Sequence, residues 1–258
     1  MNQTGKLPIT VTIIACNEEK RIGECLSSVQ WSDDIVVVDS GSSDRTVEIA
    51  ESHGARVIHN PWPGYGEQKQ FASSQAKNEW ILNLDADEYI TPELAESIRS
   101  AFSTTSPESP VAFECNFEHF LMGKWLRHGE AFPDPHIRLF NRQHGDWNSR
   151  PIHEHIEISG EIGKLEGTIR HRTVESLAEY IDKINRYTDL QAEIVLQSGV
   201  RVTFPQLFTR SLWRFLRGYI LRLGFLDGVA GLTHSMTSTL TSYLKYAKAY
   251  ELQNREKE

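Results

Sequence analysis

Short apolar runs alternate with stretches of helical spacing along the first hundred residues. β-Branched runs bounded by polar residues predict buried strands, and apolar residues at i, i+3, i+4 and i+7 predict amphipathic helices. Strands are expected at 9–15, 34–40, 56–60 and 80–87, and helices from near Asn17 to 29, at 41–54, at 65–78 and from Thr91 onwards. This alternation predicts a mostly parallel sheet flanked by helices, with ligands beyond the carboxyl ends of its strands.

Polar and small residues mark the expected ends of these helices. Thr91 is the expected N-cap of its helix, with Pro92 in the first turn. Asp44 is the expected N-cap of the second helix, and Gly54 its stop signal.

The later part of the chain is less regular. Residues 103–110 are expected to form a loop, 111–117 and 136–140 strands, and 174–196 a helix. Two domains are therefore expected, an α/β domain over 1–172 and a helical region over 173–258.

A basic amphipathic segment covers residues 199–226, which contain five arginines and no acid. Taken as one helix, it places Arg210, Arg214 and Arg217 in a stripe opposite Phe208 and Leu212. Such a helix suits the interface of an anionic membrane. The alternative is a helix packed on the rest of the protein or on a partner chain, with its arginines in water.

The net charge of −8 is unevenly distributed. Residues 1–200 hold 18 Lys/Arg and 31 Asp/Glu, whereas residues 201–258 hold 9 and 4. The acidic body argues against nucleic-acid binding. Neither a signal peptide nor a membrane span is expected, because the first residues lack a basic stretch followed by a long apolar one and no run of about 20 apolar residues occurs. Three scattered cysteines predict reduced thiols packed as small apolar residues in a cytosolic protein.

Acidic and amide side chains follow three of the expected strands. They begin at Asn17, Asp39 and Asp85, in the stretches NEE, DSGSSD and DADE. Since the carboxyl ends of parallel strands share one edge of a sheet, these groups are expected to gather there.

Asp85 and Asp87 are expected on the same side of an extended backbone. Paired carboxylates suit Mg²⁺ or Mn²⁺, which in turn bridges phosphate oxygens; a solvated acidic loop is the alternative. Asp39 can accept hydrogen bonds from a base or from sugar hydroxyls, and Gly41 allows a tight turn. The chain has no GxxxxGK[ST] phosphate loop, which argues against ATPase chemistry.

Three stretches together resemble the family 2 glycosyltransferases, which have the Rossmann-like GT-A fold. They are VTIIACNEEKRIGECLSSV (11–29), IVVVDSGSSDRTVEIAESHGARVI (35–58) and EWILNLDADEYITPE (79–93). The resemblance implies inverting sugar transfer from a nucleotide-sugar, usually a UDP-sugar, with Asp85 and Asp87 as the metal-binding DxD pair. It implies a nucleotide site whose candidate residues are Ala15, Asn17, Glu18, Asp39, Ser42, Lys69, Asp85 and Ala86.

The second half resembles the bacterial lipopolysaccharide inner-core β-1,4-glucosyltransferases. The matching stretches are DPHIRLFNR (134–142), RPIHEHIEI (150–158), IRHRTVESLAEYIDKINRYTDLQA (169–192) and GFLDGVAGL (224–232). This resemblance implies transfer of glucose to a lipid-linked heptose at the inner face of the cytoplasmic membrane. Another glycan, lipid or protein acceptor is the alternative.

An inverting transferase needs a carboxylate that takes the proton of the attacking hydroxyl. Glu154, between His153 and His155, is the first candidate on the resemblance, and Asp134 is the second. On a strand the two histidines would face away from Glu154. His171 could complete the metal site.

Further basic groups could serve the acceptor or phosphate groups. Arg138, Arg170 and His153 are the candidates, although most arginines pair on protein surfaces.

Two other classes remain open from the residues alone. A nucleotidyltransferase also pairs carboxylates with a metal, but the glycine-rich phosphate loop is missing. A non-enzymatic, flavodoxin-like nucleotide-binding module leaves the long second half unexplained. The donor sugar, the acceptor, the metal preference and the oligomeric state are not determined by the sequence.

Overall fold

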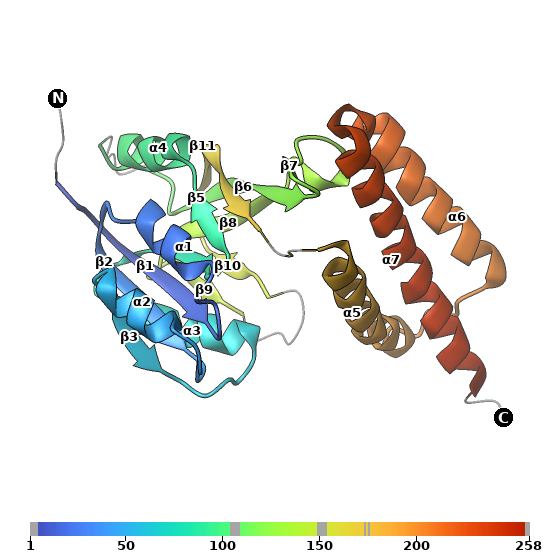
Figure 1. The fold of residues 1–258 in the computed structure, drawn as a ribbon, viewed down its shortest axis with the longest axis horizontal. Coiled ribbons are helices and arrows are strands. Elements are labelled where there is room, and N and C mark those ends of the chain that lie inside the picture. Colours follow the sequence, from blue (N-terminus) through green and yellow to red (C-terminus); the bar gives the residue numbers. More distant parts are fainter. Residues whose placement is uncertain (1–4, 104–108, 149–153, 173, 175, 256–258) are drawn as a thin grey trace. The chain divides into compact units, whose positions relative to one another are not determined.

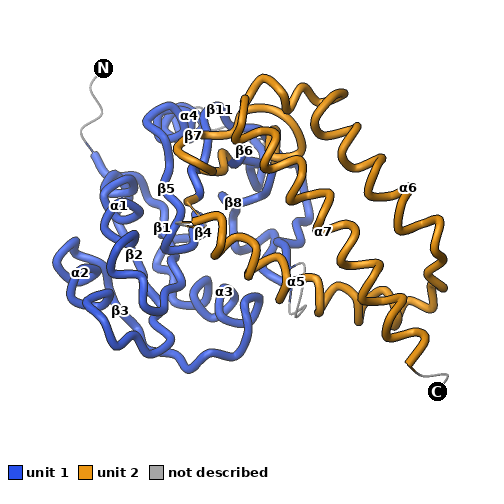
Figure 2. Tube along the Cα trace, turned by 45° about the vertical axis from the view of Figure 1, so that its right-hand side comes forward, with its two compact units in different colours: residues 1–117, 135–171 blue, residues 118–134, 172–258 orange. Residues whose placement is uncertain are grey.

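The computed structural model describes residues 5–103, 109–148, 154–172, 174 and 176–255. The chain forms two compact units, coloured separately in Figure 2. The sheet unit comprises residues 1–117 and 135–171, and the helical unit comprises residues 118–134 and 172–258. The boundary expected after residue 172 stays a prediction.

The main sheet runs in the order β3-β2-β1-β4-β8-β6-β11-β5. Its first four strands pair in parallel, as predicted, and the pairs β4–β8, β6–β8 and β11–β5 are antiparallel. Helical crossovers join the parallel strands, whereas β4 to β5 and β6 to β8 are connected without an α-helix. The strands are β1 (Leu7–Ala15), β2 (Ser32–Asp39), β3 (Arg56–His59), β4 (Trp80–Asp85), β5 (Glu88–Ile90), β6 (Ala112–Leu121), β8 (Pro135–Asn141) and β11 (Ile162–His171).

Three short strands lie off this path. β7 (Lys124–Trp125) pairs with the end of β6. β9 (Gly145–Trp147) and β10 (Ile156–Ile158) form a separate antiparallel pair.

Four helices belong to the sheet unit: α1 (Ile22–Ser28), α2 (Thr46–Ser52), α3 (Tyr65–Ser74) and α4 (Pro92–Ser103) (Figure 1). The Thr91 hydroxyl accepts a hydrogen bond from the Leu94 N–H at 3.3 Å, so Thr91 caps α4 as predicted. The stop signal for α2 is also confirmed, since Gly54 follows the helix with φ +79°.

Two expected helix starts are wrong. α1 begins at Ile22 rather than near Asn17. Asn17 has a left-handed backbone (φ 58°), so a right-handed helix cannot start at this residue. α2 begins at Thr46, and its N-cap position is Arg45, which makes no side-chain cap bond. Asp44 still accepts a hydrogen bond from the Thr46 N–H at 3.0 Å.

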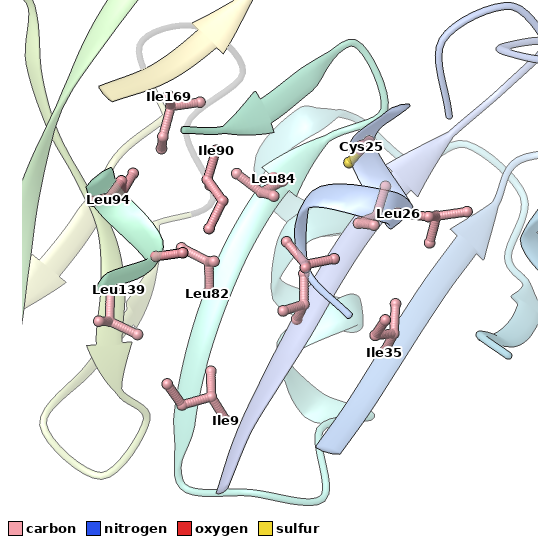
Figure 3. Close-up of a cluster of buried hydrophobic side chains, with 14 of the residues drawn as sticks. Ile9, Cys25, Leu26, Ile35, Leu82, Leu84, Ile90, Leu94, Leu139 and Ile169 are labelled. Carbon is pink, nitrogen blue, oxygen red and sulfur yellow. The ribbon is translucent and has the colours of Figure 1, made fainter. Parts of the chain in front are cut away.

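The core of the sheet unit is formed by apolar side chains from both halves of the sheet and the helices over it (Figure 3). Ile9, Leu26, Leu82 and Leu139 are fully buried within it, and burying each such side chain contributes roughly 1.5–3 kcal/mol. Cys25 and Cys115 are buried free thiols, as predicted, whereas the free thiol Cys16 is exposed.

The helical unit contains α5 (Leu177–Gln197), α6 (Phe204–Phe215) and α7 (Gly228–Arg255). The segment 199–226, treated above as one helix, is divided into α6 and two short turns. A capping box of Thr203 and Gln206 starts α6, which continues into a π-helical turn, η2 (Leu216–Leu221). The left-handed Leu223 (φ 58°) then ends the helix before a 3₁₀ turn, η3 (Gly224–Asp227). No helix among the described residues is both long and apolar enough to cross a membrane.

Candidate functional site

The three acidic motifs meet at one edge of the sheet, as predicted. Ala15 at the end of β1 pairs with Asp39 at the end of β2, and Ile14 pairs with Asp85 at the end of β4. The parallel register therefore places the groups after these strands next to one another.

The Asn17 and Asp39 turns are bonded to each other. The Asn17 N–H donates to the Ser42 hydroxyl at 2.8 Å, and the Asn17 amide oxygen accepts from the Ser43 N–H at 2.8 Å. The buried Asp39 carboxylate accepts from the Gly41 N–H at 2.9 Å and the Ser42 N–H at 3.0 Å. These bonds hold the turn rigid at the place where a nucleotide is expected.

Glu18 follows this turn and is held by Thr46 and Arg21. Its backbone N–H donates to the Thr46 hydroxyl at 2.8 Å, and its carboxylate pairs with Arg21 at 3.2 Å. Burial, with the negative charge of Asp87, raises the pKa of Glu18 above its usual value. Asp87 therefore lies close enough to Glu18 for their charges to interact.

Asp85 and Asp87 do not share an extended backbone, contrary to the prediction. β4 ends at Asp85, and Ala86 and Asp87 form a turn into β5. The Glu88 carboxylate accepts from the Asp85 N–H at 3.0 Å across this turn. The turn directs the two aspartates to different partners.

Asp85 faces a buried lysine on α3. The Lys69 Nζ lies 3.2 Å from the Asp85 Oδ1 and 3.6 Å from the Glu154 Oε1, and 4.6 Å from the centre of the Trp147 ring. Only 3% of the Lys69 side chain is exposed. Charge attraction and a cation–π contact thus hold one ammonium between two carboxylates.

Arg138 on β8 is the second buried cation of the site. Its guanidinium donates to the Glu88 carboxylate at 3.0 Å and the Asn83 amide oxygen at 3.3 Å, and lies 4.0 Å from Asp85. Burial lowers the pKa of Arg138, but Glu88 and Asp85 outweigh it and raise the pKa overall. The pKa of Glu88 is raised overall, because the effect of burial is larger than that of the positive charge of Arg138, which lowers it.

Asp87 pairs with His171, the last residue of β11. The Asp87 Oδ2 lies 3.1 Å from the His171 Nε2, and both side chains are less than 20% exposed. Burial lowers the pKa of His171, but the hydrogen bond that its ring donates to Asp87 and the negative charges of Glu88, Asp87 and Asp85 raise it overall.

Asp87 and His171 could supply two ligands of a metal ion. Among the residues that the structure describes, no three His, Cys, Asp or Glu side chains come together as a complete set of metal ligands. Mg²⁺ is nonetheless commonly held by one or two protein ligands together with substrate phosphates and water. The Asp87 carboxylate suits Mg²⁺ or Mn²⁺ on those terms, and the His171 imidazole is a type of ligand that transition metals prefer, whereas Asp85 is engaged by Lys69 and Arg138.

The candidate bases lie in different units. Glu154 precedes β10 in the sheet unit and contacts Lys69. Asp134 lies in the helical unit, where its carboxylate is 3.0 Å from the His119 Nε2. His155 is exposed and contacts Asn148 at 2.9 Å, outside any strand, and His153 lies outside the described residues.

Three described residues of this site were not among the predicted site residues. Trp147 covers both Lys69 and Arg138, and Glu88 joins Arg138 to the acidic turn. Burial and the charges of Asp85 and Glu154 raise the pKa of Tyr65, so this tyrosine also lies near the acids. Glu88 beside the DAD triplet was a visible signal, whereas nothing in the local pattern marked Trp147.

Residues 10–111 match the family model of Glycosyl transferase family 2. The lipopolysaccharide core biosynthesis glycosyltransferase LpsC of Rhizobium meliloti is 32% identical over 254 residues, which cover 95% of this chain and 93% of LpsC. The chain belongs to glycosyltransferase family 2. An uncharacterized glycosyltransferase of Rickettsia typhi is also 32% identical, over 95% of this chain and 87% of the relative.

The fold agrees with this family. Glucosyl-3-phosphoglycerate synthase from Mycobacterium tuberculosis, in a crystal structure with phosphoglyceric acid, superposes with a TM-score of 0.50 at 17% identity. The match covers 75% of this chain and 80% of that chain. The fold is α/β with a C-terminal helical region, and the family match decides against the non-enzymatic and nucleotidyltransferase alternatives.

Proposed function

We propose that this glycosyltransferase moves a hexose, glucose in the first instance, from a UDP-sugar to a heptose of a lipopolysaccharide inner core. The name of the Rhizobium meliloti relative, a lipopolysaccharide core biosynthesis enzyme, supports the acceptor class. The reaction would take place at the inner face of the cytoplasmic membrane, where a lipid-linked acceptor meets a soluble donor.

The main support for the proposal is that Lys69 contacts both Asp85 and Glu154. These contacts place Glu154 at the acidic edge of the sheet. A transferase needs a donor site and a proton acceptor side by side. Lys69 holds the Glu154 carboxylate in place beside Asp85, at the edge where the Asn17 and Asp39 turns would hold the nucleotide.

Different residues of the chain would have different roles in the reaction. Asp87 and His171 would hold Mg²⁺ or Mn²⁺, and such an ion, when bound, offsets the negative charge of the diphosphate. Glu154 takes the proton from the acceptor hydroxyl, and the hydroxyl oxygen bonds to the anomeric carbon. The bond from that carbon to the diphosphate oxygen breaks, and UDP leaves with its electron pair.

Calorimetry tests the donor site. We expect UDP and UDP-glucose to bind in the presence of Mn²⁺ or Mg²⁺. Asp87→Asn is expected to abolish the increase in affinity that the metal ion causes. Glu96→Gln is the matched control, since its carboxylate is exposed on α4. Equal binding by native protein and Asp87→Asn would refute the metal assignment.

A transfer assay tests the acceptor. Radiolabelled glucose from UDP-glucose is expected to reach a heptose-containing inner-core lipid, and not a core that lacks the heptose. Donor hydrolysis without transfer to that lipid would overturn the acceptor while leaving the donor site standing.

A further inference from the structure

Three arginines of the helical unit surround one buried carboxylate. The Glu130 side chain is only 8% exposed, and its Oε1 lies 3.2 Å from the Arg217 Nε and 3.8 Å from the Arg222 Nε. The Arg214 Nε lies 3.8 Å from the Glu130 Oε2. One negative charge faces three positive charges, and each of these arginine side chains is more than 40% exposed. The cluster therefore has a net positive charge that can attract an external anion.

Large apolar side chains are exposed at the end of η2, in η3 and at the start of α7. Leu221 is 63% exposed, Leu226 51% and Val229 68%. Arg222 lies between them in sequence. A soluble protein rarely leaves such a concentration of apolar side chains in water unless they contact a partner or a membrane.

α6 also exposes large apolar side chains. Phe204 and Phe208 are 73% and 72% exposed, and Leu212 is 51% exposed. α6 and α7 lie side by side within the helical unit (Figure 1). The groove between these two helices has a volume of about 420 Å³ and is lined almost entirely by apolar groups, including Phe208, Leu212 and Met236.

We propose that the surface formed by Leu221, Leu226, Val229 and the three arginines docks the enzyme on an anionic phospholipid bilayer. The three apolar side chains enter the interface, and Arg214, Arg217 and Arg222 bind lipid phosphates. Guanidinium groups bind phosphate oxygens with two parallel hydrogen bonds.

Charge complementarity selects the bilayer as the occupant. Residues 199–226 carry no acid, while the rest of the chain is strongly acidic and would be repelled by an anionic surface. The proposal concerns binding alone and does not depend on which sugar is transferred.

Vesicle co-sedimentation of the full chain tests the proposal without donor or acceptor. We expect binding to vesicles that contain phosphatidylglycerol, weak binding to pure phosphatidylcholine, and release at high salt. Arg217→Gln with Arg222→Gln is expected to weaken binding about 30-fold, at roughly 1 kcal/mol per arginine. Lys183→Gln with Arg255→Gln, which removes the same charge elsewhere in the helical unit, is expected to change it little.

The apolar part has its own variant. Leu221→Ser with Val229→Ser is expected to weaken vesicle binding, whereas Leu190→Ser, at a residue 47% exposed on α5, is not. Circular dichroism verifies the folding of each variant, and UDP binding is measured separately, so a failed donor site would not be mistaken for failed docking.

Three results would overturn the proposal. One is no binding to phosphatidylglycerol vesicles. Another is an equal loss of vesicle binding in the test and control variants. The third is a dimer in sedimentation velocity that Leu221→Ser with Val229→Ser dissociates, which would assign the surface to a second copy of the chain.

Discussion

The His171 Nε2 lies 3.1 Å from the Asp87 Oδ2, although 84 positions separate the two residues in the chain. The antiparallel pairing of β11 with β5 accounts for the contact, since His171 is in register with Glu88, the neighbour of Asp87. One strand pairing thus adds an imidazole to the acidic turn.

Removing His171 is expected to weaken the metal dependence of nucleotide binding. His171→Ala would leave Asp87 as a single ligand, so UDP affinity in Mn²⁺ should fall at least about tenfold, equivalent to about 1.4 kcal/mol. Calorimetry with and without Mn²⁺ measures this. His144→Ala, at an exposed turn residue, serves as the control. An unchanged effect of Mn²⁺ in His171→Ala would show that the imidazole is not a ligand.

Substitution of the two candidate bases distinguishes between them. Glu154→Gln keeps the size of the side chain but cannot accept the proton, so kcat is expected to fall about 10²–10⁴-fold. UDP binding should change little. Asp134→Asn, with its carboxylate bound to His119, is expected to reduce kcat far less. A larger loss in Asp134→Asn would reverse the assignment.

Lys69→Met is expected to impair both stability and turnover. The substitution leaves Asp85 and Glu154 beside each other without their shared cation. Losing one partner of a largely buried pair should lower the free energy of unfolding by about 3 kcal/mol, measured by urea denaturation. Lys77→Met is the control, because Lys77 is 64% exposed although it lies 3.4 Å from Asp34. Equal stability losses in the two variants would contradict the role of Lys69.

The Asp34–Arg56 pair is expected to make stability depend on pH. Burial raises the pKa of Asp34, but hydrogen bonds from Arg56 and Thr10 outweigh it and lower the pKa from 3.8 to about 2. The contribution, about 2 kcal/mol, is therefore complete above about pH 4 and is lost as the pH falls towards 2.

Urea denaturation of native protein and Asp34→Asn checks this at pH 7 and pH 3. The difference in unfolding free energy between the two proteins should shrink at pH 3. A constant difference would mean that the ion pair does not titrate in this range.

Most strands and helices of the first hundred residues could be predicted because their signals are local, although the starts of α1 and α2 could not. Apolar runs such as 9–15 and the Thr91 cap depend on a few neighbouring side chains, and parallel strands follow from the helices between them. The convergence of the Asn17, Asp39 and Asp85 motifs required only the rule that parallel strands end at one edge.

The tertiary structure decided how the side chains of that edge are paired. Lys69, Glu154 and Trp147 come from different elements, so no local spacing relates them. The same holds for the arginines of α6 and η2, whose common partner, Glu130, lies far from them in sequence. Sequence alone determined the family, the parallel strands and the acidic edge, since these depend on local patterns. The pairing of buried charges was decided by long-range packing, because each buried charge needs a partner that only the folded chain brings near.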